Sequence, residues 1–459
     1  MQKRMRAIVI SLALVLVYLA PSLVQEHTQA SGDGLFSTYA PVELTLTAPF
    51  SELFPKASTN TGEAMKGTLS YVDPASNQPV TIDNVMVSTR GHTSAREDEC
   101  TFPKLKLTFG GQPQGSMFRD TGAIKIGTHC GERADAELSS QYGRWGNEKA
   151  PQREVAVYRL LEAMDIPALK ARPARMTYVD SGARSQAPLV RNAMLLEDDS
   201  SALKRLGATR QYDEKTFGAA RGTFTDLDTA KLALAEAMTG NFDWCLRFYP
   251  GDTYRCDSRH PLWNVMALVG PDGKAFPVLH DFDLAGMVVG RHPWFNDVFN
   301  EAAGATQLEV EVVSQVQRTR SLFPRAVLDA ARRSLAGRKA AAYQALREAD
   351  VDSEGRATIE SYLKSFFAAI ETDAAFYRPV VVSAQTRAFT QADPQQPVCG
   401  DGSIPPGTPV SKPIEENGDK SLVTVIDALW HWATKKECAA GRKAVWIPTS
   451  AIGTEYPKY

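Results

Sequence analysis

The chain has 459 residues, among them 27 prolines and 32 glycines, and a formal net charge of -2. A charge so close to zero argues against a nucleic-acid-binding protein, which normally carries a basic excess. The length suits two or three domains with ordinary hydrophobic cores, and proline and glycine usage does not require a large disordered region.

The first thirty residues have the features of an export signal. Three basic residues within the first six precede a largely apolar run from Ala7 to Ala20, and the segment after it ends in TQAS, residues 28–31, with small residues where a signal peptidase could cut. The run suits a signal-peptide core and is short for a membrane span. We expect residues 1–30 to be a signal peptide and the protein to be secreted or to lie in the periplasm or cell envelope, with no membrane span after cleavage. An uncleaved membrane anchor is the alternative.

Six cysteines without a CxxC pair favour disulfides over zinc knuckles. Exported cysteines usually pair, and the sequence leaves several connectivities open. Proximity along the chain suggests the simplest set, Cys100–Cys130, Cys245–Cys256 and Cys399–Cys438.

Apolar periodicity predicts a mainly β first half and a mainly helical second half. Alternating apolar residues predict strands at 42–48, 67–73, 85–91, 103–110 and 174–180. Helical spacing predicts helices at 153–164, 226–240, 309–323, 323–349 and 353–372. The proline-rich texture beyond Arg378 predicts a linker over 379–394, and short β-like runs after it predict a small β domain over 395–459.

Two acids flank one aromatic residue in HDFDLAG, residues 280–286, directly after an apolar strand. Alone, this pattern indicates either a solvated turn or a metal-binding corner. It is preceded by a helix ending at Gly240, by Asp243 in the next loop, by Asn264, and by a hairpin with the turn GPDGK. Protein-kinase-like phosphotransferases use this order of helix, Asp, Asn, hairpin and Asp.

The residue types suit phosphoryl transfer. Carboxylate and amide oxygens bind Mg²⁺, and a further carboxylate can take the proton of the acceptor hydroxyl. Such a site also needs a strand lysine held by a helix glutamate. Lys104 and Lys106 face the same side of one strand, and Glu154 shares a helix face with apolar residues, where a carboxylate favours a cationic partner. The alternative is a solvated lysine row and a first-turn glutamate favoured by the helix dipole.

These stretches resemble the CotH family of secreted, atypical protein kinases. VMVSTRGHTS followed by FPKLKLTF is similar to the family's RGNSS and PKKSYKIKF signature. REVAVYRLLEAMDIPA resembles its Arg-rich helix, and NFDW, Asn264 and HDFDLAG resemble its NWD…N…DFD catalytic segment. The similarity extends over about residues 40–290.

The resemblance implies an α+β, two-lobed protein-kinase-like fold, with a β-rich N-lobe over 34–190 and a helical C-lobe over 191–378. It implies ATP and Mg²⁺ or Mn²⁺ as cofactors, and transfer of the γ-phosphoryl group to a Ser/Thr hydroxyl of a protein. Carried over residue by residue, it implies that Asp243 is the catalytic residue and that Asn264, Asp281 and Asp283 bind the metal. Lys106 (or Lys104) with Glu154 becomes the phosphate-positioning pair. Arg90 belongs to the RG signature and is grouped with the cofactor-binding residues, while a structural arginine packed at the lobe interface is the alternative.

The chain also departs from this pattern. Asn264 follows Asp243 by 21 positions, whereas the family keeps a much shorter spacing. A disulfide between Cys245 and Cys256 would close the insert into a side loop. There is no obvious glycine-rich phosphate loop, so a pseudoenzyme without turnover stays open, as does transfer of AMP in place of phosphate.

The C-terminal segments GTPV, ENGDKSLVTV and AVWIPTSAIG resemble bacterial SH3-like modules. This implies an all-β SH3-like domain that binds cell-wall material or a peptide, while a structural cap on the helical half is the alternative. A third function therefore stays open, that of a cell-envelope binding protein acting through this module.

Overall fold

A computed structural model describes most of the chain after residue 33. The described residues are 34–59, 63–74, 76–111, 113–131, 149–183, 186–213, 215–217, 223–246, 262–290, 307–320, 322–382, 386–393, 395–398, 403–426 and 444–454. The predicted signal peptide and the cysteines Cys256, Cys399 and Cys438 lie outside these residues.

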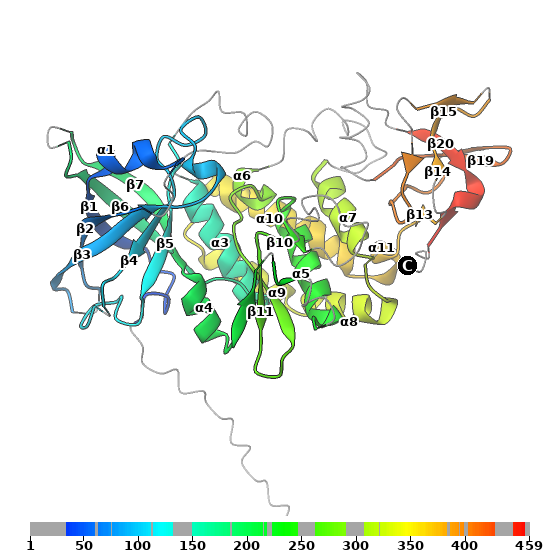
Figure 1. Cartoon of the computed structure of the whole chain (residues 1–459). Helices are drawn as coiled ribbons and strands as arrows, with labels where there is room; N and C mark the ends of the chain where they lie inside the picture. The colour runs from blue at the N-terminus through cyan, green and yellow to red at the C-terminus, as the bar shows by residue number, and fades with distance from the viewer. Residues whose placement is uncertain are drawn as a thin grey trace, which may run out of the picture. The chain divides into compact units, whose positions relative to one another are not determined.

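Seven strands close into a barrel, coloured blue to green in Figure 1. They are β1 (Val42–Ala48), β2 (Ala64–Val72), β3 (Pro79–Thr89), β4 (Leu105–Thr108), β5 (Ala123–Gly127), β6 (Ala171–Asp180) and β7 (Leu189–Glu197). Their order around the barrel is β1-β2-β3-β4-β5-β7-β6, and the barrel closes where β6 runs parallel to β1. Alternate residues of β1 are buried, as expected for a strand that faces a core on one side.

The mixed α+β class is confirmed, but the closed barrel was not predicted. The five predicted strands are present, while β5 and β7 were missed because their buried residues are largely consecutive and do not alternate. The domain boundary predicted at residue 190 falls inside β7.

The barrel has a hydrophobic core of its own, and the described helices contribute most residues of a second hydrophobic core. They are α1 (Phe50–Leu53), α3 (Ala150–Ala163), α4 (Asp199–Arg205), α5 (Asp226–Thr239), α6 (Gly286–Val289), α7 (Gln307–Arg320), α8 (Arg325–Ala336), α9 (Lys339–Glu348), α10 (Ser353–Ile370) and α11 (Asp373–Phe376). Short 3-10 turns occur at η1 (Phe54–Lys56), η2 (Thr93–Ala95) and η5 (Thr449–Ala451). The single helix predicted over 323–349 is two helices, because α8 ends at Gly337. The predicted end of α5 is confirmed, since Gly240 adopts the left-handed conformation, with φ 66°, that favours glycine at a helix C-cap.

A small sheet lies beside these helices. It consists of β8 (Arg210–Tyr212), β11 (Val265–Val269) and β12 (Ala275–Leu279), and β9 (Cys245–Leu246) pairs with β10 (Leu262–Trp263). The predicted hairpin is β11–β12, and its turn is closed by the Gly270 N–H, which donates to the Lys274 carbonyl at 2.8 Å.

Helix α3 is tied to the helical part through Arg153, whose side chain is fully buried. Its Nε and one terminal nitrogen each donate to a carboxylate oxygen of Asp352 at 2.9 Å, and the other terminal nitrogen donates to the Val288 carbonyl at 3.3 Å. Asp352 is also the N-cap of α10. On other faces α3 contacts β6 and β7 of the barrel. One helix therefore links the barrel to the helical part.

The C-terminal strands form three small sheets with a hydrophobic core of their own. The strands are β13 (Val380–Val381), β14 (Thr386–Arg387), β15 (Phe389–Gln391), β16 (Gln396–Pro397), β17 (Ser403–Ile404), β18 (Glu415–Asn417), β19 (Lys420–Val423), β20 (Val445–Pro448) and β21 (Ile452–Gly453). Strands β13 to β15 lie in the segment predicted as a linker, and β13 pairs with β21, so that segment belongs to the β region. In the described ranges, no helix has both the length and the apolar character needed to cross a membrane.

Cys100 and Cys130 form a disulfide, which confirms one predicted pair. Beside it, the Phe102 N–H donates to the Cys130 carbonyl at 2.9 Å. The cross-link thus joins the stretch before β4 to the stretch after β5. Cys245 also forms a disulfide, and its predicted partner Cys256 is outside the described residues.

Replacing Cys100 and Cys130 together by serine should lower the free energy of unfolding by about 2–5 kcal/mol, because the cross-link closes a loop in the unfolded chain. Its two ends are 30 positions apart. Urea unfolding followed by tryptophan fluorescence measures the change. An unchanged midpoint with an unchanged slope would contradict the expectation.

Asp352→Asn should destabilise the protein by about 3 kcal/mol at neutral pH, because Arg153 would keep a buried charge with a weaker partner. Hydrogen bonds from Arg153 lower the pKa of Asp352 in the folded protein, despite the opposing effect of burial. The carboxylate therefore stabilises the fold fully above about pH 4, the unfolded value, and this stabilisation is lost as the pH falls through the lower folded pKa. The difference in melting temperature between wild type and Asp352→Asn, measured from pH 7 to pH 2, should shrink on acidification; a constant difference would show that this pair does not carry the effect.

Candidate active site

Lys104 lies at the entrance to β4 and points to a group of acids. Its Nζ is 2.8 Å from Oδ1 of Asp281 and 2.9 Å from Oδ2 of Asp283, and only 10% of its side chain is exposed. Burial disfavours the ammonium form, but the charges of Asp281, Asp283 and Glu154 outweigh it and raise the pKa of Lys104. Lys104 correspondingly holds the pKa of Asp281 below its usual range, against the effect of burial.

Glu154 approaches the same ammonium from α3. The residue is buried, and burial raises the pKa of its carboxyl to about 7, with Lys104 lowering it and the two aspartates raising it further. Its Oε1 accepts a hydrogen bond from the Phe282 N–H at 3.2 Å. The helix glutamate therefore interacts with the charge of the lysine electrostatically and binds the backbone between the two aspartates directly.

Tyr158, one helical turn after Glu154, is a site residue that the sequence interpretation missed. Its hydroxyl accepts a hydrogen bond from the Asp281 N–H at 3.0 Å, and its ring meets that of Phe282 edge-on with centroids 5.2 Å apart. Residues four apart on a helix share a face, and that spacing from Glu154 was the available signal. Together the two side chains bind consecutive backbone N–H groups of the DFD segment.

Asn264 and Asp281 lie at the open end of the β11–β12 hairpin, opposite its turn. Val265 pairs with Leu279, and the His280 N–H donates to the Asn264 carbonyl at 3.4 Å. Both Asn264 and Asp281 have left-handed backbone, with φ of 54° and 64°. Such a conformation is uncommon outside glycine, although Asn and Asp tolerate it best, and it concentrates at functional sites.

Asp243 is held by the two residues directly before β11, Trp263 and Asn264. The Asn264 amide nitrogen donates to the Asp243 carbonyl at 2.6 Å and to its Oδ2 at 3.1 Å, and the Trp263 indole donates to Oδ1 at 3.1 Å. The structure thus brings Asp243 to Asn264 despite the long insert between them.

The two lysines of the β4 stretch have different partners. Lys106 pairs with Asp198, the N-cap of α4, at 2.7 Å. Lys104, not Lys106, is therefore the lysine beside Glu154. Arg90, at the end of β3, donates through Nε to the Leu105 carbonyl at 3.3 Å, and among the described residues none accepts from its two terminal nitrogens.

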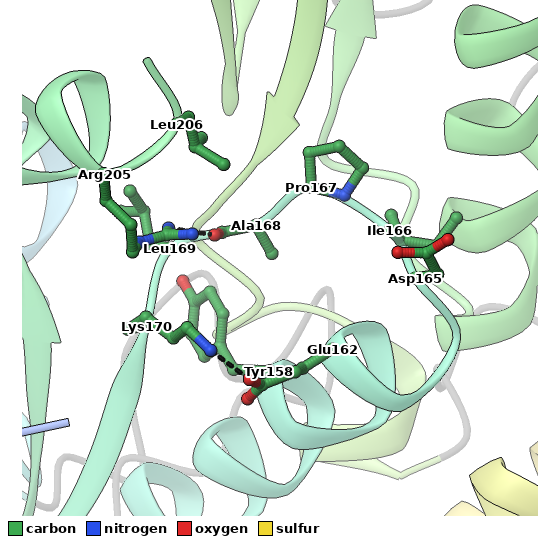
Figure 2. A pocket seen from close by; sticks show the side chains of 10 residues that line it. All are labelled: Tyr158, Glu162, Asp165, Ile166, Pro167, Ala168, Leu169, Lys170, Arg205 and Leu206. Atoms are coloured by element: carbon green, nitrogen blue, oxygen red, sulfur yellow. Dashed lines mark hydrogen bonds and ion pairs between the residues drawn. The ribbon is translucent and has the colours of Figure 1, made fainter. Parts of the chain in front are cut away.

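The segment at residues 167–169 is hydrogen-bonded to the end of β12, the strand that leads to Asp281. Leu279 donates to the Pro167 carbonyl at 3.0 Å and accepts from the Leu169 N–H at 3.2 Å, so residues 167–169 pair with β12 just before Asp281. Figure 2 shows the pocket around this segment, with Tyr158 on one wall and Arg205 bonded to the Ala168 carbonyl. Tyr158 therefore contacts Asp281 on one side and lines this pocket on another.

The donors present suit a divalent cation that also binds phosphate. Within the described ranges there is no cluster of three or more His, Cys, Asp or Glu side chains able to enclose a metal. Asp281 and Asp283 nevertheless direct one oxygen each at a single positive charge. Mg²⁺ is commonly bound by one or two carboxylates together with phosphate oxygens and water, so this smaller set fits.

Comparison with known proteins assigns no family. No protein-family model matches the chain, and no curated protein sequence matches it.

Proposed function

We propose that the protein is an exported, CotH-like kinase that transfers the γ-phosphoryl group of ATP to a Ser or Thr hydroxyl of a protein, with Mg²⁺ or Mn²⁺. One observation carries the proposal: Lys104 forms ion pairs with Asp281 and Asp283, with the charge of Glu154 nearby, beside the hairpin end where Asn264 holds Asp243. In this proposal the barrel and the helical part are the two lobes of a kinase-like fold.

The acids supply the metal side of the reaction. Asp281 and Asp283 would hold the cation, with Asn264 beside them at the hairpin end, and the cation would neutralise charge on the phosphates. Glu154 and Tyr158 hold the backbone of residues 281–282, which keeps both aspartates oriented. Lys104 would then bind phosphate oxygens while its ammonium stays close to Glu154.

Asp243 supplies the acceptor side. Its carboxylate orients the Ser or Thr hydroxyl and takes the proton as the hydroxyl oxygen forms a bond to the γ-phosphorus. The bond between that phosphorus and the bridging oxygen to the β-phosphate breaks, and ADP leaves. Trp263 and Asn264 hold the carboxylate in one orientation during this step.

The C-terminal β region has a separate role in the proposal. It has its own hydrophobic core, built from residues such as Val381, Val423 and Ile447. We assign it to an SH3-like module that binds cell-wall material or a peptide and brings the kinase to its substrate.

ATP labelled at the α or γ position tests the transfer. The full chain is incubated with each label, Mg²⁺ or Mn²⁺, and Ser/Thr-rich acceptor proteins. We expect transfer of the γ label, and a loss of about 100-fold or more in Asp243→Asn, because general-base catalysis contributes at least that factor. Lys104→Ala and Asp281→Ala should lose transfer to a similar degree.

Lys66→Ala is the matched control, because Lys66 is an exposed lysine on β2 of the same barrel. Transfer of the α label would show that the site transfers AMP to the acceptor and does not phosphorylate it. ATP binding without transfer, sensitive to Asp281→Ala, would identify a pseudoenzyme. Label that persists in Asp243→Asn and Asp281→Ala would refute the site.

Arg90→Ala should raise KM for ATP about 10-fold or more while kcat changes less, because a charge-assisted bond to phosphate would be lost from ground state and transition state alike. Arg90→Lys keeps the charge without the paired donors, so its KM for ATP should lie between the values of wild type and Arg90→Ala. Steady-state kinetics with varied ATP measures both. An unchanged KM would remove Arg90 from the nucleotide site.

A further inference from the structure

We propose that Glu236 and Asn241, two buried residues that the sequence interpretation did not select, form a relay that positions Asp243. This inference rests on the proposed role of Asp243 as the base on the acceptor side. Neither residue touches the reacting atoms in this scheme; both act through the loop that carries Asp243.

The relay is a chain of hydrogen bonds from the core to the loop. Glu236 lies in the last turn of α5, and the Asn241 amide nitrogen donates to its Oε2 at 3.0 Å. The Asn241 amide oxygen accepts from the Asp243 N–H at 2.9 Å. Both Glu236 and Asn241 are completely buried. Because each end of the amide has one partner of the required kind, the side chain has a single satisfied orientation.

The start of the same loop is fixed from two further directions. The Asn241 N–H donates to the Glu236 carbonyl at 3.0 Å, next to the left-handed Gly240. The Gly240 carbonyl accepts from the Gly286 N–H at 3.1 Å, which joins this loop to the loop after Asp283. A Cβ at Gly240 or Gly286 would lie only 2.3 or 1.9 Å from atoms of the buried Tyr362, so both glycines allow close packing on that ring.

The carboxyl group of Glu236 serves the relay in its neutral form. No cationic side chain pairs with it in the described part of the chain, and its Oε1 has no hydrogen-bond partner there. Burial raises the pKa of Glu236 well above its ordinary value, with Asn241 opposing and the charge of Asp243 adding to the effect. A neutral acid can accept from Asn241 and leaves Asp243 as the charged group of the loop.

A buried polar atom without a partner destabilises a fold and calls for an explanation. An apolar residue would pack better at position 236 than a carboxyl group with an unused oxygen. The retained carboxyl is explained by the bond to Asn241, and through Asn241 by the position of Asp243. This is the pattern expected where a functional group is kept at a cost in stability.

The indole N–H of Trp263 provides a test that does not depend on activity, because it donates to Oδ1 of Asp243. The full chain, labelled with ¹⁵N at its 7 tryptophans, is measured by NMR, and Trp263→Phe identifies the resonance. Glu236→Leu, which removes the acceptor and keeps the bulk, should shift this resonance and speed its exchange with solvent at least about tenfold. Glu236→Gln, which keeps a neutral acceptor, should leave both close to wild type.

Asn241→Ser interrupts the relay without altering α5 and should act like Glu236→Leu; it also serves if Glu236→Leu fails to fold. In transfer assays, both disrupting variants should lower kcat about 10-fold or more with little change in KM for ATP, and Glu236→Gln should restore it. An unshifted indole resonance in Asn241→Ser would overturn the relay. If wild type shows no transfer, the proposed function fails, while the indole measurement still decides the relay.

Discussion

A single buried ammonium, that of Lys104, joins three parts of the chain that are distant in sequence. It pairs with Asp281 and Asp283 beyond the β11–β12 hairpin and interacts electrostatically with Glu154 of α3. A buried charge is tolerated only when it is compensated, so the barrel, the helix and the hairpin must be placed together for any of these groups to be stable. The acids exceed the cation in number, and such an excess of negative charge suits a site that receives a divalent ion.

Helix α3 transmits this constraint to the rest of the fold through adjacent residues. Arg153 reaches Asp352 at the start of α10, while Glu154 and Tyr158 reach the backbone of the DFD segment. Because successive residues on a helix point in different directions, one short stretch can bind two neighbours at once. The segment at 167–169 adds a third connection by pairing with Leu279.

Local patterns predicted some features of the site and left others undecided. The HDFDLAG segment, the hairpin and the Gly240 helix end are where periodicity and turn residues placed them. The two lysines could not be separated in this way, because Lys104 and Lys106 share a strand face and only the positions of Glu154 and Asp198 distinguish them. The closure of the barrel by β1 and β6 was also out of reach, since it pairs strands more than a hundred residues apart.

Tyr158, Glu236 and Asn241 were missed for a related reason. Tyr158 and Glu236 have an ordinary helix context, and Asn241 is only the first residue of the NFDW segment. Their roles are revealed by hydrogen bonds, from the Asp281 N–H to Tyr158, from the Asn241 amide to Glu236, and from the Asp243 N–H to Asn241. A carboxyl group within the apolar run of α5 was the one local sign for Glu236. The sequence by itself determined five strands of the barrel, the positions of the longer helices, the hairpin turn and the order of acids along the chain, because these depend on near neighbours. Only the tertiary structure decided which lysine meets the acids and which buried groups hold them, because compensation of a buried charge depends on residues that the fold alone brings together.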